Sequence, residues 1–214
     1  MTEPTTPGDL VSRADRLGVR IPREAAQCLL AYLDAMLQLN ERINLTGVRD
    51  REAAVCLHLL DSLAVGLLGL DPSRVLDLGS GNGFPGLGAA ALYPRAVVVL
   101  LDRTGKKVRA IDSCLKTTGW PRVETLQGDA AQLPALRRDL RGAFDLVTAR
   151  AVGEPAAVAP LAAPLIRPGG RLALWLDARS EPPSRCGGLC REKTLRYSLP
   201  PPAERSRILA AFRR

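Results

Sequence analysis

A glycine-rich segment directly after a short apolar run is the feature that most limits how this chain can fold. Residues 75–78 read Val-Leu-Asp-Leu, and four of the next eight residues, 79–86, are glycine. Glycine lets a chain turn sharply from a strand into a helix, and it lets a ligand approach the main chain closely. Because Ala and Leu dominate from there to Tyr93, we expect a strand, a glycine turn and a helix in succession.

The chain after this unit continues to alternate apolar runs with helical patterns. Continuous apolar strands separated by helices are typical of a parallel sheet covered on both faces, so the predicted fold class is α/β. The predicted elements are strands at 75–78, 96–102, 123–126, 144–148 and 172–176, helices at 104–116 and 155–165 with a helical segment before 144, and a closing hairpin at 194–199 and 207–212.

The first 70 residues show helical patterns and no convincing strand. Pro22 precedes a helix that should end near Asn40, and further helical segments are expected at about 50–58 and 60–68. Residues 1–7 are rich in Pro and Thr, and we expect them to be frayed. The sequence thus predicts an N-terminal helical layer over residues 1–70 and an α/β core over residues 71–214.

Composition excludes several classes of protein. A chain of 214 residues with 46% hydrophobic and 24% charged residues is long and apolar enough for a folded core, which excludes wholesale disorder. No run reaches the roughly 18 uncharged apolar residues of a membrane span. The opening residues lack a basic region followed by an apolar stretch, so we expect no secretory signal and a cytoplasmic location.

The net charge of +8 comes mostly from arginine and is concentrated toward the C-terminus. Residues 179–214 carry nine basic and three acidic side chains. Arginine is well suited to phosphate, so the charge indicates a nucleic-acid partner; a general compositional bias toward arginine explains it equally well. The tail arginines that we expect to contact RNA phosphates are Arg191, Arg196, Arg205, Arg207, Arg213 and Arg214.

Cysteine spacing gives little support for a metal site. Cys186 and Cys190 form a C-x3-C pair, but the only histidine is His58 and no second pair stands nearby. A structural zinc site needs four ligands, so we expect no metal.

The glycine segment fits two kinds of cofactor. Residues 81–86 match G-x-G-x-x-G, which by itself weakly indicates a dinucleotide. Asp77, at the end of the preceding strand, would repel a pyrophosphate and suits a cation. S-adenosyl-L-methionine carries a sulfonium and an ammonium, so Asp77 and the loop from Gly79 through Gly81 to Gly83 favour it.

Two further strand ends support this interpretation. Asp102 ends the second predicted strand, where an acid binds ribose hydroxyls of either cofactor. Residues 128–131 follow the third predicted strand, where we expect them to lie beside the adenine ring. Methyl transfer is therefore the leading hypothesis, with a dinucleotide enzyme and a protein without catalysis as the alternatives.

Several motifs resemble one known family in the same order along the chain. They are Asn44-Leu45-Thr46, His58-x-x-Asp61-Ser62-Leu63, the segment from Asp77 to Gly86, Thr148-Ala149-Arg150-Ala151-Val152, and the tail with Tyr197-Ser198-Leu199-Pro200 and Arg207-Ile208-Leu209. Together they resemble the RsmG (GidB) family of 16S ribosomal RNA guanine-N7 methyltransferases. Two segments depart from the family pattern: Leu176-Asp177-Ala178 stands where a Lys-Gly pair is usual, and residues 180–190 replace a longer helical segment.

The resemblance implies a class I S-adenosylmethionine-dependent methyltransferase fold, Rossmann-like and mostly parallel, with an N-terminal helical layer. It implies transfer of a methyl group to N7 of a guanine (guanine 527) in 16S ribosomal RNA or the small ribosomal subunit, with no membrane partner, and we expect a monomer. Another RNA or a small molecule as substrate, and a non-catalytic RNA-binding relative, stay open. The cofactor contacts that it implies are Gly79, Phe84, Asp102, Arg103, Thr104, Ala130, Ala131 and Arg150.

Guanine N7 has a free lone pair and no proton to lose, so attack on a methyl group needs no general base. Alignment and exclusion of water should supply most of the rate. We therefore expect Arg150 and Asn44 to position groups, although Arg150 also fits an ordinary salt bridge and Asn44 a turn. His58 and Asp61, three residues apart, are expected to pair with each other rather than to contact RNA. Phe84 packs beside the cofactor or in the core.

Overall fold

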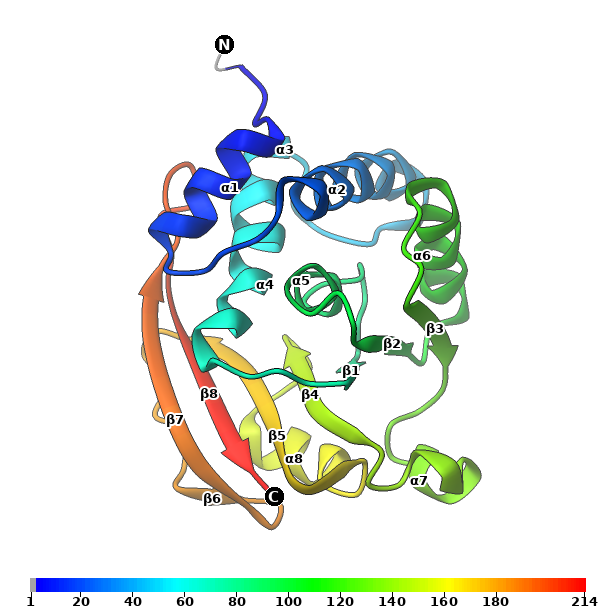
Figure 1. Cartoon of the computed structure of the whole chain (residues 1–214). Helices are drawn as coiled ribbons and strands as arrows, with labels where there is room; N and C mark the ends of the chain where they lie inside the picture. Colours follow the sequence, from blue (N-terminus) through cyan, green and yellow to red (C-terminus); the bar gives the residue numbers. More distant parts are fainter. Residues whose placement is uncertain (1–2) are drawn as a thin grey trace.

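Eight strands form one mixed sheet in the computed structural model, which describes residues 3–214 (Figure 1). The strand order is β3-β2-β1-β4-β5-β8-β7-β6. The five strands β1 to β5 run parallel to one another, whereas β8 pairs antiparallel with β5 and β7, and β6 pairs antiparallel with β7. This confirms the predicted α/β class with a closing hairpin. The bounds are β1 Arg74–Leu78, β2 Val97–Asp102, β3 Val123–Gln127, β4 Phe144–Arg150, β5 Ile166–Asp177, β6 Arg185–Cys186, β7 Leu189–Ser198 and β8 Ser206–Arg213.

Helices cover both faces of the sheet. Side chains alternate between the faces along a strand, so Val75 belongs to an apolar cluster with α1, α2, α5 and α6, and Leu76 to a cluster with α7 and α8. The bounds are α1 Pro7–Arg16, α2 Arg23–Ile43, α3 Arg51–Ala54, α4 Asp61–Leu63, α5 Gly86–Leu92, α6 Gly105–Thr118, α7 Leu133–Leu136 and α8 Pro155–Ala162, with a π-helical segment at Val55–Leu60 and 3₁₀ turns at Ala64–Leu68 and Arg138–Leu140.

The start of the chain is more ordered than its composition indicates. Thr5 is buried and bonds to Glu52 through both its N–H and its hydroxyl. Thr6 caps α1 reciprocally with Asp9, so two of the free N–H groups at this helix end are satisfied. The expected fraying is therefore wrong from Thr5 onward; residues 1 and 2 lie outside the described range.

Two other expectations differ from the structure. The helices expected at 50–58 and 60–68 form one continuous helical run, Arg51–Leu68, interrupted by the π-helical segment. Strand β5 begins at Ile166, six residues before the predicted start, because residues 166–170 extend along β4 across a bulge.

The N-terminal helices share their apolar cluster with one face of the sheet. The boundary after residue 70 is not tested by this packing and stays a prediction. Within residues 3–214, none of the helices has both the length and the apolar character that a membrane crossing requires.

Candidate functional site

The candidate site is a cavity of about 680 Å³ at the carboxyl ends of β1 and β4. These strands are neighbours, and the chain winds away from them in opposite directions, which is where open α/β sheets bind ligands. The wall contains the loop after β1 (residues 79–82), Arg150 at the end of β4, residues 151, 153 and 154 after it, and the end of β5. Leu45 and Val48 close it from the helical layer.

The loop after β1 is held by main-chain bonds. The N–H groups of Gly79 and Ser80 both donate to Leu101 O at 2.9 Å, and the Gly83 N–H donates to Ser80 O at 2.7 Å. Gly81 has φ +56, and a Cβ there would find only Gly79 O, at 3.8 Å. Glycine is thus required at residue 81 by backbone conformation and leaves open space beside the main chain.

Asp102 joins this loop to the end of β2. Its Oδ2 accepts the Gly81 N–H at 2.9 Å, and its Oδ1 accepts the Thr104 N–H at 2.8 Å. A second cavity, of about 400 Å³, meets the first at Gly79, Asp102, Lys107 and Ala151. Its lining includes the predicted contact residues Arg103, Thr104 and Ala130.

Asp77 lies behind the loop and is fully buried. The Thr148 hydroxyl donates to its Oδ1 at 2.6 Å and the Gly86 N–H to its Oδ2 at 3.0 Å. Burial raises the pKa of Asp77 to about 6, although both hydrogen bonds oppose the shift. From this buried position, Asp77 supports the glycine loop from behind.

Two other predicted cofactor residues are likewise set back. A Cβ on Gly83 would lie 2.5 Å from Tyr32 Oη, so this glycine allows α2 to approach the loop. The Ala131 N–H donates to Asp129 Oδ1 at 2.9 Å. Within the part of the chain that the structure describes, Asp77, Gly83 and Ala131 do not line either cavity.

Arg150, the last residue of β4, reaches the helical layer from the cavity wall. Its Nη1 donates to Leu57 O at 2.8 Å and to Asp61 Oδ2 at 2.9 Å, and its Nη2 lies 3.5 Å from Phe84 O. Phe84 is buried and stacks on the His58 ring, with centroids 5.9 Å apart and planes at 6°. Arg150 therefore fits both predicted roles, the salt bridge and the positioning group, because the ion pair with Asp61 fixes a side chain that also lines the cavity.

His58 and Asp61 take different partners, contrary to the expected pairing. The His58 Nε2 lies 3.0 Å from Thr46 Oγ1, whereas Asp61 bonds to Arg150 and to the Tyr197 hydroxyl. The π-helical turn before Asp61 alters the three-residue spacing on which the expectation rested. Burial, and secondarily the charge of Arg150, lowers the pKa of His58 to about 3, so its ring is neutral at physiological pH.

Asn44 ends α2 in the left-handed conformation, with φ +53 and ψ 63. Its side chain is exposed, and the next residue, Leu45, lines the cavity. Asn40 holds this loop by accepting the N–H groups of Leu45 and Thr46 at 2.6 and 2.8 Å. The structure thus gives Asn44 a turn role, and its contact with a base stays a prediction.

Sequence reasoning missed several residues of the site. Lys107 in the first turn of α6 lines both cavities, and Trp175 on β5 lines the first while its Nε1 donates to Asp61 O at 2.7 Å. The loop residue Ser80 is 1% exposed, and its Oγ has no hydrogen-bond partner within residues 3–214. Lys107 and Trp175 carried no signal apart from their places at a helix start and a strand end. Ser80 lies inside the glycine segment itself.

Cys186 and Cys190 lie on β6 and β7, at the edge of the sheet away from the cavity. In the described residues, no three side chains of the His, Cys, Asp and Glu types gather in a way that would hold a metal ion.

Solved structures show the same fold. The chain aligns with the crystal structure of a predicted O-methyltransferase from Agrobacterium tumefaciens at a TM-score of 0.57 and 24% identity, covering 72% of this chain and 78% of that one. An S-adenosylmethionine-dependent methyltransferase from Aquifex aeolicus gives a TM-score of 0.55 at 16% identity, over 75% of this chain and 92% of that one. These identities show the fold alone, which is the predicted class I methyltransferase fold.

Sequence comparison identifies the family. The family model described as "GidB: rRNA small subunit methyltransferase G" matches residues 25–181. Proteins named ribosomal RNA small subunit methyltransferase G from Halorhodospira halophila and Sorangium cellulosum are 38% and 36% identical, over 76% and 83% of this chain and 75% and 74% of theirs. The one from Chloroflexus aggregans is 40% identical over 66% of this chain, and the chain spans 59% of that protein.

The glycine loop, Asp102 and Arg150 thus line one cavity, and the chain matches this family over most of its length. The chain belongs to the GidB family of rRNA small subunit methyltransferases, whose cofactor is S-adenosyl-L-methionine.

Proposed function

We propose that this protein transfers the methyl group of S-adenosyl-L-methionine to N7 of a guanine in 16S ribosomal RNA. The observation that carries the proposal is that the glycine loop, Asp102 and Arg150 face one cavity at the carboxyl ends of β1 and β4. Family membership supports ribosomal RNA as the substrate. The choice of guanine N7 as the methylated atom rests on the family resemblance.

The residues present fit the cofactor. Asp102 faces both cavities with lone pairs left for ribose hydroxyls, and Arg103, Thr104 and Ala130 surround the space proposed for the adenine. The buried Ser80 Oγ, unpaired within the described chain, would accept or donate one further bond to a polar ligand. Asp77 and Gly83 support the loop from behind, and Ala131 lies next to the adenine space.

When bound, S-adenosylmethionine supplies an electrophilic methyl group on a sulfonium. The protein has to align guanine N7 with it and keep water out, because N7 has no proton to remove. The buried His58 ring is neutral and adds no charge next to the base that becomes cationic. Arg150 positions a group of the substrate or the cofactor carboxylate, and Asn44 is proposed to contact the base from the rim.

A methyl-transfer assay tests this function. The purified protein is incubated with methyl-labelled S-adenosylmethionine and with small ribosomal subunits or 16S ribosomal RNA that lack the modification. The expected result is label in RNA at one guanine, where N7 methylation makes the chain sensitive to reduction and aniline cleavage. Label in free guanosine but not in RNA would indicate a small-molecule enzyme, and S-adenosylmethionine binding without transfer to either would contradict catalysis.

We also propose that the protein acts as a monomer in the cytoplasm. The cytoplasmic location follows from the proposed ribosomal RNA substrate. Light scattering after size exclusion should give one mass near 22.9 kDa, and a stable dimer would contradict the monomer.

A further inference from the structure

Asp61 is a fully buried acid whose carboxylate is shared by side chains from three strands. Its Oδ2 accepts from Arg150 on β4 at 2.9 Å, and its Oδ1 accepts from the Tyr197 hydroxyl on β7 at 2.5 Å. Arg207 on β8 lies 3.6 Å away through its Nε. Burial and Asp61 raise the pKa of Tyr197 far above its usual value, so its hydroxyl stays a donor to this carboxylate.

The local helix is shaped for this contact. In a regular α-helix the Asp61 N–H would bond to Leu57 O, but here it bonds to Cys56 O and His58 O. Arg150 Nη1 donates to Leu57 O and to the Asp61 carboxylate at once. A π-helical turn inside a helix is frequently found at functional sites, and here it places a main-chain acceptor beside the guanidinium.

Two arginines meet this single carboxylate at the cavity wall. Arg150 and Arg207 both line the cavity, and the Nε of Arg207 is buried with no hydrogen-bond partner among the described residues. Methylation at N7 leaves a cationic base in the same cavity. An acid that offsets one of the two arginine charges therefore favours the product, and an acid that fixes both side chains keeps their orientation.

We propose that Asp61 is a positioning residue for methyl transfer. It holds the side chains of Arg150 and Arg207 in place on the cavity wall and offsets part of their positive charge. The inference rests on the proposed function, because it concerns the same reaction. Asp61 does not contact the substrate itself, since its side chain is fully buried and both of its oxygens have partners. Its effect passes through the arginines.

Asp61→Asn is the direct test, because it keeps the shape and removes the charge. A displacement of a positioning group by about 1 Å costs about 100-fold in rate, and this is the fall in kcat that we expect. If Arg150 holds the substrate, the dissociation constant of S-adenosylmethionine should stay within about threefold of the wild type; if Arg150 holds the cofactor carboxylate, that constant should rise together with the loss in kcat. A folded Asp61→Asn protein with wild-type kcat would overturn the proposal.

Tyr197→Phe keeps the test decisive if Asp61→Asn does not fold. It removes only the hydroxyl that donates to Asp61, and the loss of one hydrogen bond to a charged group predicts a fall in kcat of about tenfold. The matched control is Asp34→Asn, which removes a half-buried acid paired with Arg51 at 2.7 Å, away from the cavity, and should leave kcat unchanged. If Asp61→Asn does not fold, a kcat of Tyr197→Phe equal to that of the wild type would overturn the proposal.

A double variant separates positioning from a purely structural role. If Asp61 acts through Arg150, then Asp61→Asn combined with Arg150→Gln should have a kcat within about threefold of Arg150→Gln alone, since residues that act as a unit are not additive. Full multiplication of the two effects would overturn the coupling. If the wild-type protein transfers no methyl group to RNA, then the proposed function fails and this proposal falls with it; an active wild type confines any failure to the role of Asp61.

Discussion

Asp102 binds Gly81 and Thr104 at the same time, accepting one main-chain N–H with each carboxylate oxygen at 2.9 and 2.8 Å. The glycine loop after β1 is thereby fixed to the turn after β2. A ribose bound at this strand end has to share a carboxylate that already holds the loop in place. In the proposed cofactor complex, Asp102 would therefore bind the ribose and hold the glycine loop at the same time.

Asp102→Ala should weaken S-adenosylmethionine binding by roughly 1–3 kcal/mol, the range for hydrogen bonds to a charged group. Asp102→Asn keeps one acceptor oxygen and should fall between alanine and the wild type. Titration calorimetry measures both variants. A wild-type dissociation constant for Asp102→Ala would mean that the ribose lies elsewhere.

Gly81→Val should abolish cofactor binding in a folded protein. The φ of +56 is strained for a β-branched side chain, at a cost of about 1–3 kcal/mol, while a Cβ there has open space around it. The added atoms would fill the space where the ligand approaches the main chain. Gly81→Ala is the matched variant and should bind weakly. Undiminished affinity in Gly81→Val would remove the basis for placing the cofactor on this loop.

The raised pKa of Asp77 predicts an unusual pH dependence. Its value of about 6 lies above the unfolded value of 3.8, so the ionised form costs folding free energy. This cost is fully present above pH 6, shrinks as the pH falls from 6 to 4, and is absent below. Asp77→Asn resembles the protonated acid and should be more stable than the wild type by up to about 3 kcal/mol at pH 7.5.

Thermal unfolding of wild type and Asp77→Asn at pH 7.5 and at pH 4 checks this prediction. The melting temperature of the variant should be higher at pH 7.5 and equal at pH 4. A variant that is less stable at pH 7.5 would show that Asp77 is stabilising as an anion.

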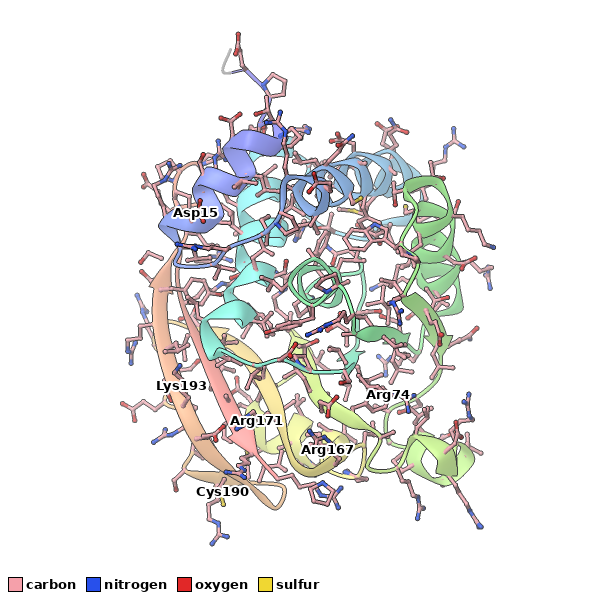
Figure 2. The ribbon with its side chains drawn as sticks, viewed as in Figure 1. Asp15, Arg74, Arg167, Arg171, Cys190 and Lys193 are labelled. Carbon is pink, nitrogen blue, oxygen red and sulfur yellow. The ribbon has the colours of Figure 1, made fainter. Side chains whose placement is uncertain are left out.

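Most of the arginines in the tail bind within the protein. The guanidinium groups of Arg191, Arg196 and Arg214 donate to main-chain carbonyls, and Arg213 lies 4.0 Å from Glu192. Glu192 also pairs with Arg171, which is labelled in Figure 2. Lys193, also labelled in Figure 2, donates to Leu67 O at 3.1 Å. The cavity lining includes only Arg205 and Arg207 of the described tail arginines. We therefore propose that Arg205 and Arg207 are the tail arginines that contact RNA phosphates next to the cavity.

Arg205→Gln should weaken RNA binding and lower the slope of log affinity against log salt by about 0.7–0.9, the value for one phosphate contact. Arg213→Gln removes the same charge at the far end of β8 and should leave the slope unchanged. Binding of 16S ribosomal RNA at several salt concentrations measures both. Equal slopes for the two variants and the wild type would place the RNA contact elsewhere.

Strands β1, β2 and β4 were predictable because their residues are mostly apolar, and β1 to β3 match their predicted bounds to within one residue. Helix α1 was missed although Thr6 and Asp9 have the spacing of a capping box, because Pro and Thr dominate its start. The early start of β5 depends on pairing with β4 across Pro168 and Gly169. No local pattern reports that pairing.

The cofactor side of the site was visible in the sequence because it lies in strand ends and their turns. The Asp61 contacts were not, because Tyr197 and Arg207 approach it from strands more than 130 residues away along the chain. The expectation that His58 pairs with Asp61 failed for a related reason: a π-helical turn changes the helical spacing, and its presence depends on tertiary contacts.

The most direct measurement of the central claim is methyl transfer from labelled S-adenosylmethionine to 16S ribosomal RNA, with the modified atom mapped by cleavage at N7-methylguanine. The account predicts label at a single guanine N7, lost in Gly81→Val and strongly reduced in Arg150→Gln. Label at another atom, or transfer that persists in both variants, would contradict the assignment of this cavity as the methyl-transfer site.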